Sequence, residues 1–110
     1  MKLPNGDRAV VSPEKLAGYA LNPSHPHGRA HAALFDRLLG ITATDAQVLH
    51  DALRRAATDE DATPGAVSTF GTKYEVRFPM SGPRGTFTVL SVWIVPTDTD
   101  LPVLVTTFVE

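Results

Sequence analysis

The residues that could perform chemistry in this sequence of 110 residues are concentrated in one segment, His25-Pro26-His27-Gly28-Arg29-Ala30-His31. It holds three of the four histidines. An imidazole exchanges protons near neutral pH, and a guanidinium binds phosphate through two parallel hydrogen bonds. Metal-free RNA cleavage needs a base for the 2′-hydroxyl, a cation for the phosphate and a proton donor for the leaving oxygen. We predict His25 and His31 as acid–base residues, Arg29 on the phosphate and His27 as a substrate contact.

Two other interpretations of this segment stay open. His27 and His31 are four residues apart, a spacing that zinc sites on helices use. The third ligand would have to come from His25, His50 or a distant carboxylate, and Gly28 interrupts the spacing at the expected helix start. We therefore expect no metal and no cofactor. In the plainest interpretation, the segment is a solvated, turn-rich loop whose histidines have no chemical role.

Two predicted strands carry further polar groups. Ser91 and Trp93 alternate onto one face, where a hydroxyl beside a large aromatic ring suits a pocket for a base or a phosphate. Thr106 shares a face with Phe108 on the last strand. We predict that Ser91, Trp93 and Thr106 line the substrate surface. The alternative is that Trp93 belongs to the core, with its indole N–H bound to the backbone, and that threonine is there as a common strand residue.

Composition excludes several classes of protein. Hydrophobic residues make up 43% and charged residues 20% of the chain, which is ordinary for a globular domain. There is no cysteine, so disulfides and cysteine nucleophiles are excluded. No apolar run approaches the roughly 18 residues of a membrane helix, and the first residues lack the apolar stretch of a secretory signal. We expect a single domain over residues 1–110, a cytoplasmic location and no membrane partner.

The charge is distributed unevenly along the chain. Residues 1–58 carry a net charge of +2 and residues 59–110 a net charge of −4. The overall basic field of a non-specific nucleic-acid binder is absent, so an anionic ligand would need a local basic pocket. The acidic second half suits a basic protein partner.

Three helices are predicted in the first half, over Ser12–Leu21, Arg29–Leu39 and Thr44–Ala57. Ser12-Pro13 is typical of an N-cap followed by proline at the first helical position. Gly40 would end the second helix. Thr44-Asp45-Ala46-Gln47 has the spacing of a capping box. The third helix would bury the face formed by Ala46, Leu49, Leu53 and Ala56 or Ala57.

The second half predicts strands over Lys73–Phe78, Thr86–Val95 and Val103–Val109. The first of these alternates polar and apolar residues throughout, which is the period of a half-buried strand. Residues 58–67 contain an acidic run and a Pro-Gly pair, so we expect a solvated linker there. The run Arg8–Val11 would add an edge strand.

The expected fold class is therefore α+β, with N-terminal helices packed on a three- to four-stranded antiparallel meander. The helical half covers residues 12–58 and the β-meander half residues 68–109.

The sequence also resembles an uncharacterised bacterial small-domain family over nearly its whole length. The best marks are an Asn-Pro-x-His-Pro-x-Gly stretch and a Ser-x-Trp strand. His31 stands where a lysine is expected in the family's helix, four residues before the phenylalanine. The resemblance rests on Leu3-Pro4-Asn5, Asp7-Arg8-Ala9, Leu21-Asn22-Pro23-Ser24-His25-Pro26, Gly28, Phe35, Leu39-Gly40 and Ser91-Val92-Trp93-Ile94.

This resemblance implies a domain that occurs alone or at the ends of phage and toxin-like proteins, with no established activity. Its layout looks like that of the small ribonucleases that include barnase, EndoU, colicin nuclease domains and RelE. Two functions therefore remain. One is a metal-independent endoribonuclease or toxin-like nuclease acting on RNA. The other is a non-catalytic interaction protein, such as an immunity or antitoxin partner or a phage accessory module, that binds a toxin or immunity protein.

Overall fold

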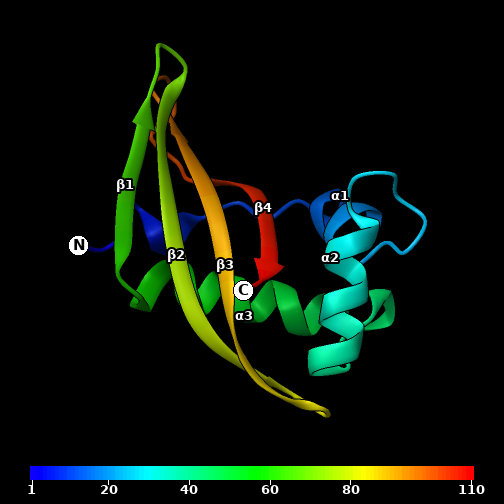
Figure 1. Ribbon diagram of the computed structural model, residues 1–110. Helices are drawn as coiled ribbons and strands as arrows, with labels where there is room; N and C mark the ends of the chain where they lie inside the picture. Colours follow the sequence, from blue (N-terminus) through cyan, green and yellow to red (C-terminus); the bar gives the residue numbers. More distant parts are fainter.

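The computed structural model of the protein describes all residues from 1 to 110. The second half of the chain forms one antiparallel sheet. Its strands follow one another in the order β1-β2-β3-β4, which is a meander (Figure 1). The helices precede it in the chain, so the predicted α+β class and meander are confirmed. The strands are β1 (Ala62–Val67), β2 (Gly71–Gly82), β3 (Gly85–Pro96) and β4 (Val103–Val109).

Three helical segments make up the first half. The second ends as predicted, because Gly40 adopts a left-handed φ of 74° directly after it. Two of the segments widen into a π-helical turn, which places their last side chains differently from those of a regular helix. The segments are α1 (Pro13–Lys15) with the π-helical turn Leu16–Ala20, α2 (Arg29–Leu34) with the π-helical turn Phe35–Leu39, and α3 (Ala46–Asp59), in addition to short 3-10 turns at Gly6–Arg8 and Ala43–Asp45.

Three local expectations were wrong. The expected linker contains strand β1, whose register shifts after Pro64; an edge strand tolerates proline because its outward N–H groups need no partner. The run Arg8–Val11 contributes only an isolated parallel bridge, between Val10 and Val103. The capping box lies two residues earlier than predicted, and joins Thr42 to Asp45.

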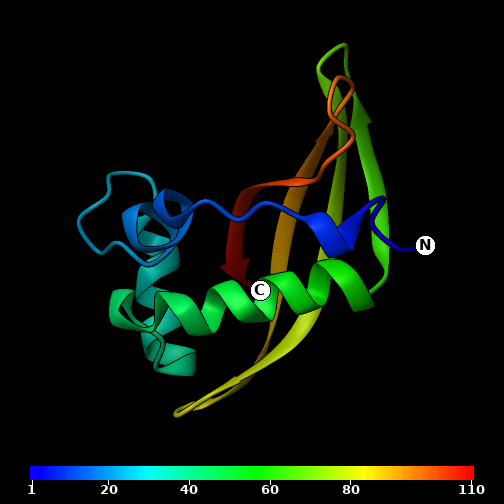
Figure 2. The same ribbon diagram turned by 180° about the vertical axis from the view of Figure 1, so that it is seen from behind.

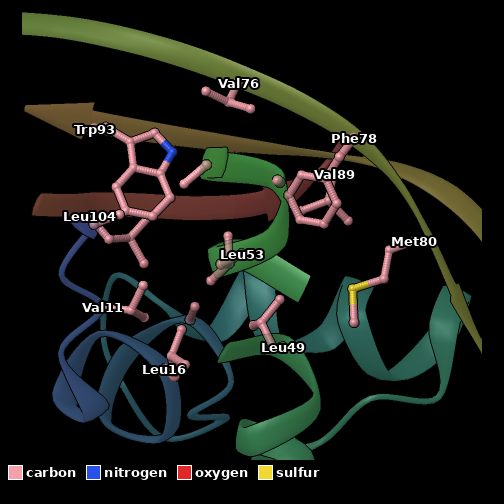
Figure 3. Close-up of a cluster of buried hydrophobic side chains, with 14 of the residues drawn as sticks. Val11, Leu16, Leu49, Leu53, Val76, Phe78, Met80, Val89, Trp93 and Leu104 are labelled. Carbon is pink, nitrogen blue, oxygen red and sulfur yellow. The ribbon is translucent and has the colours of Figure 1, made fainter. Parts of the chain in front are cut away.

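Helix α3 lies across one face of the sheet, which we call the core face, while α1 and α2 stand beside β4 (Figures 1 and 2). The apolar side predicted for α3 is the side that is buried, and it includes Leu49 and Leu53. Figure 3 shows these leucines facing Trp93 and Phe78 of the sheet. No helix has the length and apolar character needed to cross a membrane.

Ser91 and Trp93 lie inside this core. Both are 0% exposed, because α3 and the first segments of the chain cover the core face of β3. The indole N–H of Trp93 donates to Ser91 Oγ at 2.9 Å, and Ser91 Oγ donates to the carbonyl of Val76 at 2.8 Å. The prediction that Ser91 and Trp93 line a substrate surface is wrong, because neither side chain reaches the surface of the protein. The alternative, Trp93 in the core, is the arrangement found, with a hydroxyl rather than the backbone as acceptor.

We predict that Ser91→Ala lowers the free energy of unfolding by about 1–3 kcal/mol, because the buried indole N–H would lose its acceptor. The measurement is urea unfolding followed by tryptophan fluorescence. Ser81→Ala is the matched control, since Ser81 is exposed and bonds only to Thr86. Equal stability of the two variants would show that the Trp93–Ser91 bond contributes nothing.

Candidate functional site on the outer face of the sheet

The face of the sheet opposite α3, which we call the outer face, carries ordered rows of side chains. Residues that alternate away from the core on β2, β3 and β4 stand opposite one another in the strand register. Each row has an apolar residue of β3 at its centre, and five of the six row ends are polar or aromatic. The rows are Arg77–Leu90–Phe108, Glu75–Val92–Thr106 and Lys73–Ile94–Val103.

Helix α2 brings His31 onto the first of these rows. The imidazole of His31 is stacked on the ring of Phe108, with centroids 5.0 Å apart and planes 21° apart. Tyr19 follows at 6.3 Å from His31 and contacts His25 edge-on at 4.8 Å. His27, at 6.0 Å from His25, ends the series. These five residues form what we call the ring cluster, which joins the predicted histidine loop to the sheet.

Thr106 is the unusual polar group of the outer face. Its Oγ1 is buried but has no hydrogen-bond partner. Leaving a buried hydroxyl unpaired costs about 1–3 kcal/mol, so such groups are rare unless they have a use. Thr106 and Phe108 are two residues apart on one strand face, which places them about 6.6 Å apart. The unpaired hydroxyl therefore lies beside the ring on which His31 is stacked.

The side chain of His25 closes the turn that leads into α2. Its Nδ1 accepts hydrogen bonds from the backbone N–H groups of His27 and Gly28, both at 3.0 Å. Gly28 is pressed against the carbonyl of Tyr19, where a Cβ would collide with backbone. This close approach holds the loop, and with it His25, against Tyr19. Because Nδ1 accepts these two hydrogen bonds, a neutral His25 carries its proton on Nε2 and can donate a hydrogen bond there.

We predict that His25 is the Nε2–H tautomer in the folded protein. A proton on Nδ1 would face two backbone donors. Long-range ¹H–¹⁵N correlation spectra of the imidazole distinguish the two tautomers. His27 is exposed and uses no ring nitrogen within the chain, so it should show averaged tautomers and serve as the internal control. An Nδ1–H tautomer for His25 would contradict the two backbone hydrogen bonds to Nδ1.

The structure separates Arg29 from His31. Residues two apart on a helix point about 160° away from each other. Accordingly, His31 faces Phe108, while Arg29 lines a groove of about 710 Å³ beside Leu21, Ala33 and Asp36. Because they point in different directions, Arg29 and His31 do not act together on one phosphate as predicted.

The cations of the outer face are partly neutralised. Arg77 Nε donates to Glu110 Oε1 at 2.7 Å, and Arg77 also lies 3.6 Å from Glu75. The bond to Glu110 raises the pKa of the Arg77 guanidinium. Lys73, on the same face, has no ion pair. Arg77 can approach an anion only by exchanging a carboxylate for it, whereas Lys73 is available.

The remaining histidine lies elsewhere. His50 is on α3, where its Nδ1 is 3.2 Å from Asp51 Oδ1. Hydrogen bonds from His50 and Gln47 lower the pKa of Asp51. No group of three or more histidine, aspartate or glutamate side chains converges with the geometry of a metal site.

Two members of the ring cluster were missed as site residues by sequence reasoning. The sequence assigned Tyr19 only to the first predicted helix, and Phe108 was noted only for sharing the face of Thr106. The alternation of β4 was the available signal, because it predicts that Thr106 and Phe108 point the same way. Nothing in the local sequence indicates that α2 stands against that face.

The fold and this face define a small α+β domain with a polar and aromatic cluster where the helices meet the sheet edge. The chain belongs to the family named "Domain of unknown function (DUF6883)", which matches residues 2–110. The expected membership of an uncharacterised domain family is thereby confirmed.

Among the solved structures with a similar fold is a chain of the "Contact-dependent growth inhibition toxin - immunity protein complex from Klebsiella pneumoniae 342". The similarity has a TM-score of 0.68 at 22% sequence identity, and covers 96% of this chain and 97% of that chain. A comparison with curated proteins finds no match. The likeness extends over nearly the full length of both chains and establishes a shared fold.

Proposed function

We propose that this protein is a metal-independent, toxin-like ribonuclease whose active site is the outer face at His31 and Thr106. The observation that carries the proposal is the unpaired, buried hydroxyl of Thr106 beside the ring on which His31 is stacked. An imidazole and a hydroxyl donor on the same face of the sheet are groups that can move a proton and bind a phosphate oxygen. The likeness to a chain of a toxin–immunity complex, and the helices-then-meander layout, support it.

In the proposed reaction, His31 removes the proton from a ribose 2′-hydroxyl. The 2′ oxygen attacks the adjacent phosphorus, and the bond from phosphorus to the 5′ oxygen breaks. The leaving oxygen takes a proton from solvent, and the imidazolium returns its proton to solvent. Thr106 donates a hydrogen bond to a non-bridging phosphate oxygen, where negative charge develops. His25 contributes a hydrogen bond from Nε2–H rather than acting as a base. The products are a 2′,3′-cyclic phosphate and a 5′-hydroxyl.

Incubation of the purified protein with total RNA tests this proposal. We expect cleavage that EDTA does not reduce, with 2′,3′-cyclic phosphate ends. RNA in which the 2′-hydroxyl is methylated at every position should stay intact. Absence of cleavage, or cleavage that depends on a divalent ion, would refute the proposal.

A second candidate, a non-catalytic interaction protein, is favoured by a different observation. Val67 and Phe70 at the end of the β1–β2 hairpin are 77% and 78% exposed, in the acidic half of the chain. The related fold also comes from a complex of two proteins, which supports a protein partner such as a toxin or immunity protein. Affinity purification from the native host tests this candidate. A protein that cleaves RNA and retains no partner would exclude it.

A further inference from the structure

The groove of about 710 Å³ beside α2, which we call the α2 groove, has no part in the outer-face site. No residue of the sheet lines it; its walls are α2, the chain just before α2 and the turn that leads into α3. Ala33 lines it, and this residue points away from His31 because the two are two positions apart on the helix. The α2 groove and the ring cluster therefore lie on opposite sides of α2.

The two charged side chains of the α2 groove have no partner within the chain. Arg29 and Asp36 both line the groove and are exposed, and neither forms an ion pair. They are seven residues apart, which corresponds to about two turns and about 10 Å of helix rise. This spacing puts both on one side of α2 but too far apart to pair with each other. The groove thus carries a cation toward one end of α2 and an anion toward the other.

This arrangement of charges is complementary to itself. When two copies of α2 lie antiparallel about a two-fold axis, Arg29 of each copy comes opposite Asp36 of the other, so the same attraction occurs twice. The axis passes close to Ala33, near the midpoint of the two charged positions. Ala30 and Ala33 line the groove and are exposed, and their small side chains let two helices approach to about 8 Å between axes. Charge and shape therefore both suit a second copy of the same helix.

We infer that the α2 groove is the surface through which the protein pairs with a second copy of itself, each copy laying its α2 in the groove of the other. A two-fold interface uses the same patch on both subunits, which the self-complementary charges allow. Exposed ion pairs contribute little attraction, so the apolar lining supplies the affinity and the charges fix the antiparallel orientation. The patch spans only about two turns of helix, and the dimer therefore forms at micromolar to millimolar protein concentration. Both outer faces stay open.

Sedimentation equilibrium of the intact protein, from micromolar to millimolar concentration, tests the pairing without requiring any activity. We expect a reversible monomer–dimer equilibrium. Arg29→Asp puts carboxylates opposite one another at both ends of the interface, and Asp36→Arg does the same with guanidinium groups. Each variant should raise the dimer dissociation constant by about tenfold or more. Arg37→Asp is the matched control, because it makes the same charge change at an exposed position of the same segment outside the groove, and it should dimerise like the parent protein.

A mixture of the two single variants gives the sharpest result. Arg29→Asp has carboxylates at both positions and Asp36→Arg has guanidinium groups at both, so a mixed pair regains attraction at each end. The mixture should associate at least as tightly as the parent protein, which a variant that had merely misfolded could not do. A parent protein that stays monomeric at millimolar concentration overturns the inference, as does a dimer that neither variant weakens or that the mixture does not restore. A monomeric parent that binds a different protein through Arg29 and Asp36 also overturns it, and makes the groove a docking surface for that protein.

Discussion

Replacement of His31 by alanine is expected to lower kcat/KM for RNA cleavage by about 10²–10⁴-fold, the usual contribution of a positioned proton-transfer group. His31 is the histidine with access to the outer face and free ring nitrogens, since Nδ1 of His25 accepts hydrogen bonds from the backbone. His31→Gln, which keeps polarity but cannot exchange protons, should be as inactive as His31→Ala.

Two control variants distinguish a base from a structural side chain. His50→Ala removes a histidine of α3 that lies outside the ring cluster, and should leave cleavage unchanged. His27→Ala removes the exposed end of the ring series and should lower kcat/KM by less than tenfold. Thermal unfolding of His31→Ala should remain cooperative, because the half-buried ring covers Phe108 without belonging to the core. Full activity in His31→Ala would place the chemistry elsewhere.

Helices and strands in which apolar residues recur at regular spacing were predictable, because that spacing shows directly which side of the element is buried. Leu49 and Leu53 of α3 and the alternation of β2 gave the right elements and the right buried sides. Strand β1 was hidden by Pro64 and Gly65, which indicate a turn but are tolerated at a sheet edge. The pairing of β1 with β2 depends on contacts that local sequence does not show, since Ala62 stands opposite Val76, fourteen positions further along the chain.

The site was predictable only in part, for a related reason. Alternation assigns Ser91 and Trp93 to one face of β3 and Thr106 to a face of β4, but it does not say which face the helices cover. Helix α3 covers the face of Trp93, so the large aromatic ring became core, whereas Thr106 lies on the opposite face of the sheet. Likewise, the histidine loop predicted useful side chains, whereas their partners Tyr19 and Phe108 depend on how α2 docks beside β4.

Thr106→Val is expected to change stability and activity in opposite directions. Valine has nearly the same shape as threonine and removes a buried hydroxyl that has no partner, so the free energy of unfolding should rise by about 1 kcal/mol. The melting temperature should rise by roughly 4–8 °C for a domain of this size. Cleavage should fall by about 10²-fold, the usual loss when one hydrogen-bond donor to a developing charge is removed.

Thr107→Val is the matched control, because this neighbour is fully buried and its hydroxyl donates to the carbonyl of Leu90 at 2.9 Å. Here valine removes a hydrogen bond that is made, so stability should fall by about 0.5–1.5 kcal/mol while activity changes little in the folded fraction. Opposite signs for two adjacent threonines would show that Thr106 is kept unpaired for a ligand, at the expense of stability. If Thr106→Val is instead less stable and fully active, the hydroxyl is a structural group and the active site does not lie on this face.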